Sequence, residues 1–383
     1  FGTLMSAAVS QWKNEMHMHK KNKSGRCLLA LTVLPLGGEM LTEAFGQSAP
    51  GDKPPAGQLR AAGDGSPWRM EFRGKVGLNM SASFSGLGAF AAQTATGATA
   101  GVADRSYDDG FNLGDALTGG DGRTANWRYF NAAQVVGTTI NMNSSSVLGD
   151  ASTGNVGSDP APGFELAFAY EMGRKERRSW GFKGGLGYAM VETKDRQSLL
   201  ATESRRTDSF DGSAIVISPP DTTTVSRLPN APAASVTALF AGGATVPGLR
   251  ELSANLVDFR FGPYVTFDLG ERVSLTLEGG ALATVISSDF KVSESATVTG
   301  RNPVLAPGVS AVQIFQGNSS QTGVVGGGYI GLDCRVKLNE RWDLLGGVQY
   351  QYLQDFKQSL GGRQATLRLD QTIFATLGLS FKF

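Results

Sequence analysis

The strongest constraint on the fold is a strict alternation of apolar and polar residues that begins at Trp68. Between 68 and 84, the odd positions carry charges such as Arg73 and Lys75, whereas the even positions carry none. The even set is Trp68, Met70, Phe72, Gly74, Val76, Leu78, Met80, Ala82 and Phe84. A strand sends neighbouring side chains to opposite faces, and a helix would mix the two sets. The pattern therefore predicts a strand with one charge-free face.

The same alternation recurs along the rest of the chain. The further segments are 162–172, 180–194, 253–269, 272–290, 322–338, 341–357 and 365–383. In the last two segments the apolar set includes Phe356, Leu367 and Leu369. Across all segments the apolar face is charged only at Glu192, Lys194 and Asp289, near segment ends. We expect an all-β protein with eight such strands. A ten-stranded alternative adds a hairpin from 124–131 and 134–143.

The connections between these segments differ in length. Those at 173–179, 270–271 and 339–340 are short, and that at 358–364 is intermediate. Three others are long and are expected to be loops; they span 85–161, 195–252 and 291–321. Short turns at one end and long loops at the other are typical of an antiparallel up-and-down barrel that spans a membrane. We expect the barrel to occupy 68–383.

The direction of the two faces decides between a membrane barrel and a soluble one, because soluble ligand-binding barrels also alternate. Trp68, Trp180 and Trp342 each open a segment on the apolar face and predict an aromatic girdle at the membrane interface. The charged face carries both signs and is expected to form a paired network inside the barrel. Its members are Arg73, Lys75, Glu165, Lys183, Asp258, Arg260, Glu278, Asp333 and Arg335. A soluble periplasmic binding barrel stays as a further alternative.

The N-terminal part has the order of an export signal. Residues 16–46 join a basic stretch, a ten-residue apolar run and small residues around a cleavage site after Gly46. Residues 47–67 are rich in Pro, Gly and Ala and predict a flexible linker. Residues 1–15 are unassigned. We expect an exported protein.

Composition excludes several functions. The net charge of +1 lacks the basic surplus of a nucleic-acid binder, and no apolar stretch is long enough for a membrane-spanning helix. His17 and His19 both precede the expected cleavage site. Mechanisms that need histidine are then not available to the processed chain, and we expect neither an enzyme nor a cofactor.

The final alternating strand ends on Phe381 and Phe383. This end is similar to the C-terminal insertion signal of bacterial outer-membrane barrels, and the chain from Trp68 onward resembles small barrels of the OmpA, OmpX and OmpW type. The resemblance implies an eight-stranded barrel in the cell outer membrane. It also implies a lipid bilayer with lipopolysaccharide-type lipids as surroundings, and barrel-assembly machinery that reads the last strand.

An eight-stranded barrel is just wide enough for side chains to fill it, so we expect paired charges to plug the interior. The leading hypothesis is a structural or surface-interaction role carried by the long loops, with an unknown extracellular ligand. The alternative is a narrow porin-like channel for small solutes.

The first long loop is rich in Asp and Gly, and its oxygen ligands raise the question of calcium binding. The candidates are Asp108, Asp109, Asp115 and Asp121. Their order departs from that of an EF-hand loop, and Asp and Gly are common turn residues, so we expect no metal site. Aromatic residues at Trp127, Tyr129 and Phe130 either pack this loop or anchor a partner. Residues 214–217 predict an additional strand.

Overall fold

The computed structural model describes residues 66–94, 104–114, 121–222, 226–300 and 304–383. The predicted signal segment 16–46, residues 1–15 and most of the linker 47–67 lie outside these ranges. Among the described residues, no helix has the length and apolarity needed to cross a membrane.

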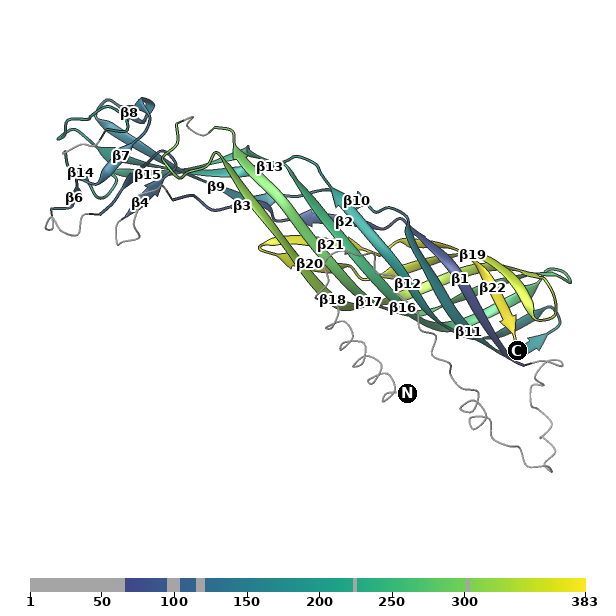
Figure 1. The fold of residues 1–383 in the computed structure, drawn as a ribbon. Helices are drawn as coiled ribbons and strands as arrows, with labels where there is room; N and C mark the ends of the chain where they lie inside the picture. The colour runs from purple at the N-terminus through teal and green to yellow at the C-terminus, as the bar shows by residue number, and fades with distance from the viewer. Residues whose placement is uncertain (1–65, 95–103, 115–120, 223–225, 301–303) are drawn as a thin grey trace, which may run out of the picture. The chain divides into compact units, whose positions relative to one another are not determined.

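The described chain is all-β, and eight of its strands pair in a closed antiparallel ring (Figure 1). In ring order these are β1 (Trp68–Leu78), β11 (Ala161–Lys175), β12 (Arg178–Asp195), β16 (Gly248–Asp268), β17 (Val273–Val298), β18 (Val312–Lys337), β19 (Trp342–Leu353) and β22 (Thr372–Lys382). Each pairs with the next, and β22 pairs back with β1 through partners such as Phe72 and Leu379. The all-β antiparallel class predicted from the alternation is confirmed.

The ring turns its apolar face outward and its charged face inward. On β17, outward residues such as Leu277 are exposed, whereas inward residues such as Glu278 are buried. The same holds on β16, where Phe261 is exposed and Arg260 is buried.

Strands β12, β16 and β17 continue beyond this region, and there the polarity of both faces inverts. Outward residues change from Met190, Val257 and Val285 to charged ones, whereas inward residues become apolar. The new outward set is Glu192, Lys194, Glu251, Asp289 and Lys291, and the new inward set includes Val191, Leu252, Ile286 and Phe290. The strands keep their alternation, so the inversion lies in the side chains themselves.

On the side of the ring formed by β1, β19 and β22, apolar residues also face inward beyond the charged region, but here the strands are interrupted. A second sheet pairs β10 (Val156–Gly157), β2 (Ser81–Ser85), β21 (Arg363–Arg368) and β20 (Phe356–Leu360) in that order. Between β1 and β2, Asn79 has a φ of 61° and donates from Nδ2 to the carbonyl of Gln371, which lies in the break between β21 and β22. The break shifts the alternation by one residue, so the side chains change faces.

This shift corrects part of the predicted outward face. Six residues expected to face outward are instead in the interior core: Met80, Ala82, Phe84, Phe356, Leu367 and Leu369. The physical reason is that the outer surface is polar at this level. The shift places Ser81, Ser83 and Ser85 on that surface and the apolar residues between them in the interior. The alternation between 68 and 84 is continuous in the sequence and gives no sign of the break.

The predicted long loops need correction, because they contain strands. Beyond the ring, β9 (Thr139–Ala151), β13 (Leu199–Asp211) and β15 (Ala234–Val246) form an antiparallel sheet, with β3 (Leu87–Phe90) and β8 (Val135–Val136) on β9. This sheet joins the ring strands where Ala244 and Thr245 pair with β17. Strands β17 and β18 extend through most of 291–321.

Smaller elements pack against one end of this sheet. They are β4 (Arg105–Tyr107), β5 (Gly110–Asn112) and β7 (Trp127–Tyr129), the pair β6 (Arg123–Thr124) and β14 (Leu228–Pro229), and the short helix η2 (Ala132–Gln134). Their core contains Tyr107, Trp127, Tyr129, Ile140, Met142, Phe210 and Leu228. We call these elements together with β8, β9, β13 and β15 the module. Trp127 and Tyr129 pack inside it. Neither β7 nor β9 enters the ring, and 214–217 forms no strand.

Candidate functional site

The interior of the ring holds a network of ion pairs centred on Arg73. Its guanidinium donates to both carboxylate oxygens of Asp333, at 2.8 and 2.7 Å, and to Glu71 at 2.5 Å. Lys183 Nζ lies 2.6 Å from Glu71 Oε2 and 2.7 Å from Glu278 Oε2. The side chains come from four different ring strands, so the network ties the walls together.

The same network extends in both directions along the interior. Arg260 donates to Glu165 and, at 2.5 Å, to Glu278 Oε1. Lys75 donates to Asp258 at 2.5 Å, and its ammonium lies 4.4 Å from the centre of the Phe374 ring.

All nine residues of the predicted interior network are thus placed inside the ring, and each is at most 6% exposed. Together with Glu71 they comprise five cations and five carboxylates, so the formal charge of the cluster is zero. Buried charges are stable only when they are paired in this way.

Glu71 is the functional residue that the sequence analysis left out of the network. It is fully buried and accepts from Arg73 and, at 3.0 Å, from Arg335, besides its contact with Lys183. The signal was present, because Glu71 lies in the same alternation phase as Arg73.

Inward-facing glycines provide the space for these long side chains. A Cβ on Gly187 would lie 2.7 Å from Lys75 Nζ, and a Cβ on Gly347 would lie 2.1 Å from Asp333 Oδ1 and 2.7 Å from the Leu332 carbonyl. A narrow ring therefore needs glycine opposite its charges. This explains part of the high glycine content, 51 of 383 residues.

Beyond the charge network the interior becomes apolar. Phe84 and Phe290 stack with ring centres 5.7 Å apart, inside a cluster that includes Phe374 next to Lys75. A second set of buried ion pairs follows: Arg250 donates to Asp195 at 2.8 Å, and Arg363 donates to Glu294 at 2.7 Å. The interior therefore consists of a charged layer, an apolar layer and a second charged layer.

Aromatic residues lie at both limits of the outward apolar surface. At the short-turn end, the Trp68 ring lies 4.9 Å from that of Tyr170, and the Trp342 ring lies 5.0 Å from that of Phe381. Trp180 is half-buried beside Gly173. At the other limit, Tyr188 and Tyr350 point outward, and the sequence analysis did not single these tyrosines out.

The last strand closes the ring. β22 lies between β1 and β19, and Phe383 packs edge-on against Phe381 at 5.3 Å. The backbone N–H of Phe383 donates to the carbonyl of Trp68 at 3.4 Å.

Three of the four aspartates considered for calcium, Asp108, Asp109 and Asp121, lie in the described part of the chain, and they do not form a metal-ligating group. Asp121 binds Arg227 at 2.6 Å, and Asp115 lies outside the described residues. Within the part of the chain that is described, no group of three or more metal-ligating side chains is found.

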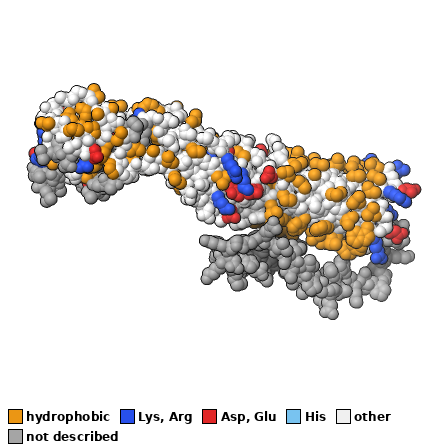
Figure 2. Space-filling model, turned by 45° about the horizontal axis from the view of Figure 1, so that its top comes forward, with side chains coloured by type: hydrophobic (Ala, Val, Ile, Leu, Met, Phe, Trp, Pro, Cys, Tyr) orange, Lys and Arg blue, Asp and Glu red, His pale blue; other side chains and the backbone are white. Residues whose placement is uncertain are grey.

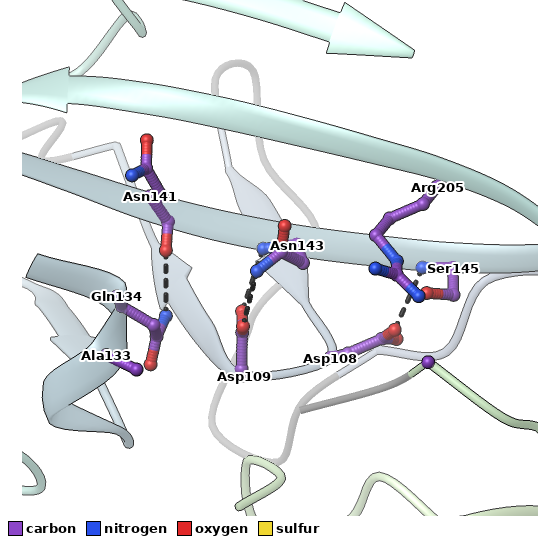
Figure 3. A pocket seen from close by; sticks show the side chains of 9 residues that line it. Asp108, Asp109, Ala133, Gln134, Asn141, Asn143, Ser145 and Arg205 are labelled. Atoms are coloured by element: carbon purple, nitrogen blue, oxygen red, sulfur yellow. Dashed lines mark hydrogen bonds between the residues drawn. The ribbon is translucent and has the colours of Figure 1, made fainter. Parts of the chain in front are cut away.

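Asp108 and Asp109 instead bind the outer edge of β9 (Figure 3). Asp109 accepts from the backbone N–H and the side-chain amide of Asn143, both at 2.8 Å, and Asp108 accepts from the N–H of Ser145 at 2.9 Å. With Gln134 and Arg205 they line a pocket of about 230 Å³. The carboxylates take up backbone donors that an edge strand leaves unpaired.

On the other face of β9 and β13, Asp208 is buried and holds three donors. It accepts from Ser235 and Tyr107, both at 2.6 Å, and from Arg206 at 2.9 Å. Burial raises the pKa of Asp208, but these hydrogen bonds outweigh it, so that the pKa is lowered. Burial, then the Asp208 carboxylate, raise the pKa of Tyr107. Asp208 therefore stays ionised and Tyr107 stays neutral, and the hydrogen bond between them stabilises the module.

Several solved structures, outer-membrane proteins among them, are similar to the chain. The chain is similar to Ail, the attachment invasion locus protein of Yersinia pestis (10% identity, 82% of this chain and 99% of that chain, TM-score 0.23). It is also similar to the outer membrane protease OmpT from Escherichia coli (8%, 84% and 99%, 0.32) and to OprG from Pseudomonas aeruginosa (12%, 84% and 98%, 0.26). No protein-family pattern and no curated protein sequence matches the chain. The fold itself is established by the strand pairing.

Proposed function

We propose that this protein is an outer-membrane protein whose eight-stranded ring spans the bilayer as a closed, non-conducting barrel and carries the module on the outer side. The observation that carries the proposal is the polarity inversion on β12, β16 and β17. At one level, the outward face changes from apolar to charged while the inward face changes from charged to apolar. Hydrocarbon outside and a dry core above it account for both changes.

The extent of the apolar surface supports this position. On β17 it runs from Val273 to Val285. At about 3.4 Å per residue and a tilt of roughly 45°, this corresponds to about 30 Å across the membrane. A typical hydrocarbon core is about 30 Å thick. Figure 2 shows the apolar side chains gathered in this region and a cluster of charged side chains at its border.

The layered interior argues against conduction. A permeating ion would have to displace the Arg73–Asp333 pair and then enter the apolar layer around Phe84 and Phe290 without a polar partner. The narrow porin-like channel is therefore the less favoured function.

The role that remains is non-enzymatic and lies in the module and the outer strands. The fixed hydrogen bonds of Asp208 and Asp109 give this region a definite surface. A surface that keeps its shape outside the membrane is suited to interaction with a partner. We propose export by the segment 16–46 as the route to the outer membrane.

A pair of substitutions on one strand tests the membrane position. Leu277→Arg places a charge within the apolar surface of β17, whereas Ser293→Arg places the same charge on the same face beyond it. An arginine on the lipid-facing surface lowers the stability of a folded barrel by about 2–4 kcal/mol near the bilayer midplane and by about 0–1 kcal/mol near or outside the interface. We expect Leu277→Arg to reduce the folded fraction in phosphatidylcholine vesicles, measured as the band that migrates faster without boiling, and Ser293→Arg to leave it unchanged. Equal effects of the two substitutions would contradict the proposal.

A further inference from the structure

The short-turn end of the ring carries a concentration of basic side chains. They lie in and beside the turns that connect β11 to β12, β17 to β16 and β18 to β19. The set is Arg174, Lys175, Arg177, Arg178, Arg272, Lys337, Arg341 and Lys382. Figure 2 shows blue and red side chains at this end, next to the apolar surface.

Two of these cations are already engaged. Arg174 donates to Glu171 at 3.1 Å and to Asp268 at 3.2 Å, and Arg178 lies over the ring of Phe267 at 5.5 Å. The other six have no carboxylate within 4.0 Å among the described residues. The exposed carboxylates of the same turns are Glu176, Glu271 and Glu340, so cations predominate by two to one.

These cations lie at the level of the aromatic girdle. Arg341 directly precedes Trp342, and Lys382 lies between Phe381 and Phe383. Girdle tryptophans lie at the depth of lipid headgroups. The basic side chains next to them are therefore within reach of headgroup phosphates.

The opposite border of the apolar surface is different. There Lys194, Glu251 and Lys291 are neighbours in one row across three strands, and Lys194 lies 2.6 Å from Glu192. With Asp289 in the adjacent row, carboxylates outnumber lysines on these strands. On these three strands, in contrast to the short-turn end, cations therefore do not exceed carboxylates.

We propose that the short-turn end binds the headgroups of anionic phospholipids in the leaflet that surrounds it. The inference rests on the proposed function, because it requires that the ring spans a bilayer. Each basic side chain near a membrane surface contributes about 1 kcal/mol of attraction to anionic lipid, which corresponds to about a fivefold preference. The anchoring is electrostatic and adds to the apolar contact of the ring.

The girdle itself provides the probe for the test. The Trp12→Phe/Trp127→Phe variant keeps only Trp68, Trp180 and Trp342 of the five tryptophans. This chain is folded into phosphatidylcholine vesicles that contain a small fraction of phosphatidylglycerol brominated on its acyl chains. Quenching is compared with that by brominated phosphatidylcholine at the same fraction. We expect phosphatidylglycerol to be enriched about fivefold near the tryptophans at low salt, and the enrichment to be lost at 1 M salt.

Two triple variants give the matched comparison. Lys175→Ser/Arg177→Ser/Arg341→Ser removes three unpaired cations from the short-turn end and should reduce the enrichment to less than twofold. Lys194→Ser/Lys291→Ser/Lys357→Ser removes three cations near the other border and should leave it unchanged. Equal quenching by the two lipids, or equal effects of the two variants, overturns the inference while the ring still inserts. Failure of the chain to insert into phosphatidylcholine contradicts the proposed function instead.

Discussion

Replacement of Glu71 by Gln tests whether the interior network stabilises the ring as a single unit. The substitution keeps the size of the side chain and removes the one carboxylate that contacts Arg73, Lys183 and Arg335 at 2.5, 2.6 and 3.0 Å. The network then holds five cations and four carboxylates in a buried space. Removal of one partner from a buried ion pair costs about 3–5 kcal/mol. We expect the free energy of unfolding of Glu71→Gln to fall by about that amount.

The assay is reversible urea unfolding of the folded protein in phosphatidylcholine vesicles, followed by tryptophan fluorescence. Glu176→Gln removes a carboxylate of the same type from an exposed turn and should change the free energy by less than about 0.5 kcal/mol. The double variant Glu71→Gln/Arg335→Gln restores neutrality, and it should recover about 0.5–3 kcal/mol relative to additive losses. A loss below about 1 kcal/mol for Glu71→Gln, with no recovery in the double variant, would refute the reasoning.

Three further predictions follow from the same structure. Planar bilayer recordings of the wild type should show no large stable conductance. Phe290→Ala should lower the free energy of unfolding by about 3–5 kcal/mol without opening a pore, because the charged network around Arg73 remains. An open pore would contradict the layered interior. Gly347→Ala should destabilise the ring, since its Cβ would lie 2.7 Å from the Leu332 carbonyl, whereas Gly270→Ala in an open turn should be neutral by urea unfolding. Because the pKa of Asp208 is lowered by folding, its contribution to module stability is present above its unfolded pKa and is lost as pH falls through the folded value. Asp208→Asn should therefore reduce the loss of module stability at low pH, measured as unfolding followed by Trp127 fluorescence, and Asp355→Asn serves as a control. An unchanged dependence of stability on acidic pH would show that Asp208 does not contribute.

The short-range pattern of the chain was sufficient to predict the antiparallel class and the members of the interior network. Alternation is a property of each strand by itself, because a pleated backbone sends successive side chains to opposite faces. Arg73, Lys183, Arg260 and Asp333 could therefore be assigned to one face without knowledge of their partners.

The partners within the network depend on the pairing of strands that are far apart in the sequence. Arg73 and Asp333 are 260 residues apart, and only the closure of β1 on β22 and β11 brings them into one interior. The central position of Glu71 follows from that closure as well.

The segments beyond the apolar surface of the ring showed the limit of the local pattern most clearly. At Asn79 the alternation of residue types continues, but the backbone adds a residue and exchanges the faces, so Met80 and Phe84 enter the core. The intervals expected to be loops contain β9, β13 and β15, which do not oppose an apolar face to a charged one as the ring strands do. β13 carries charges on both faces, and β15 carries none. The sequence alone determined which residues alternate. The tertiary structure decided which side is inside, because that depends on how each strand pairs with its neighbours and on where its backbone breaks.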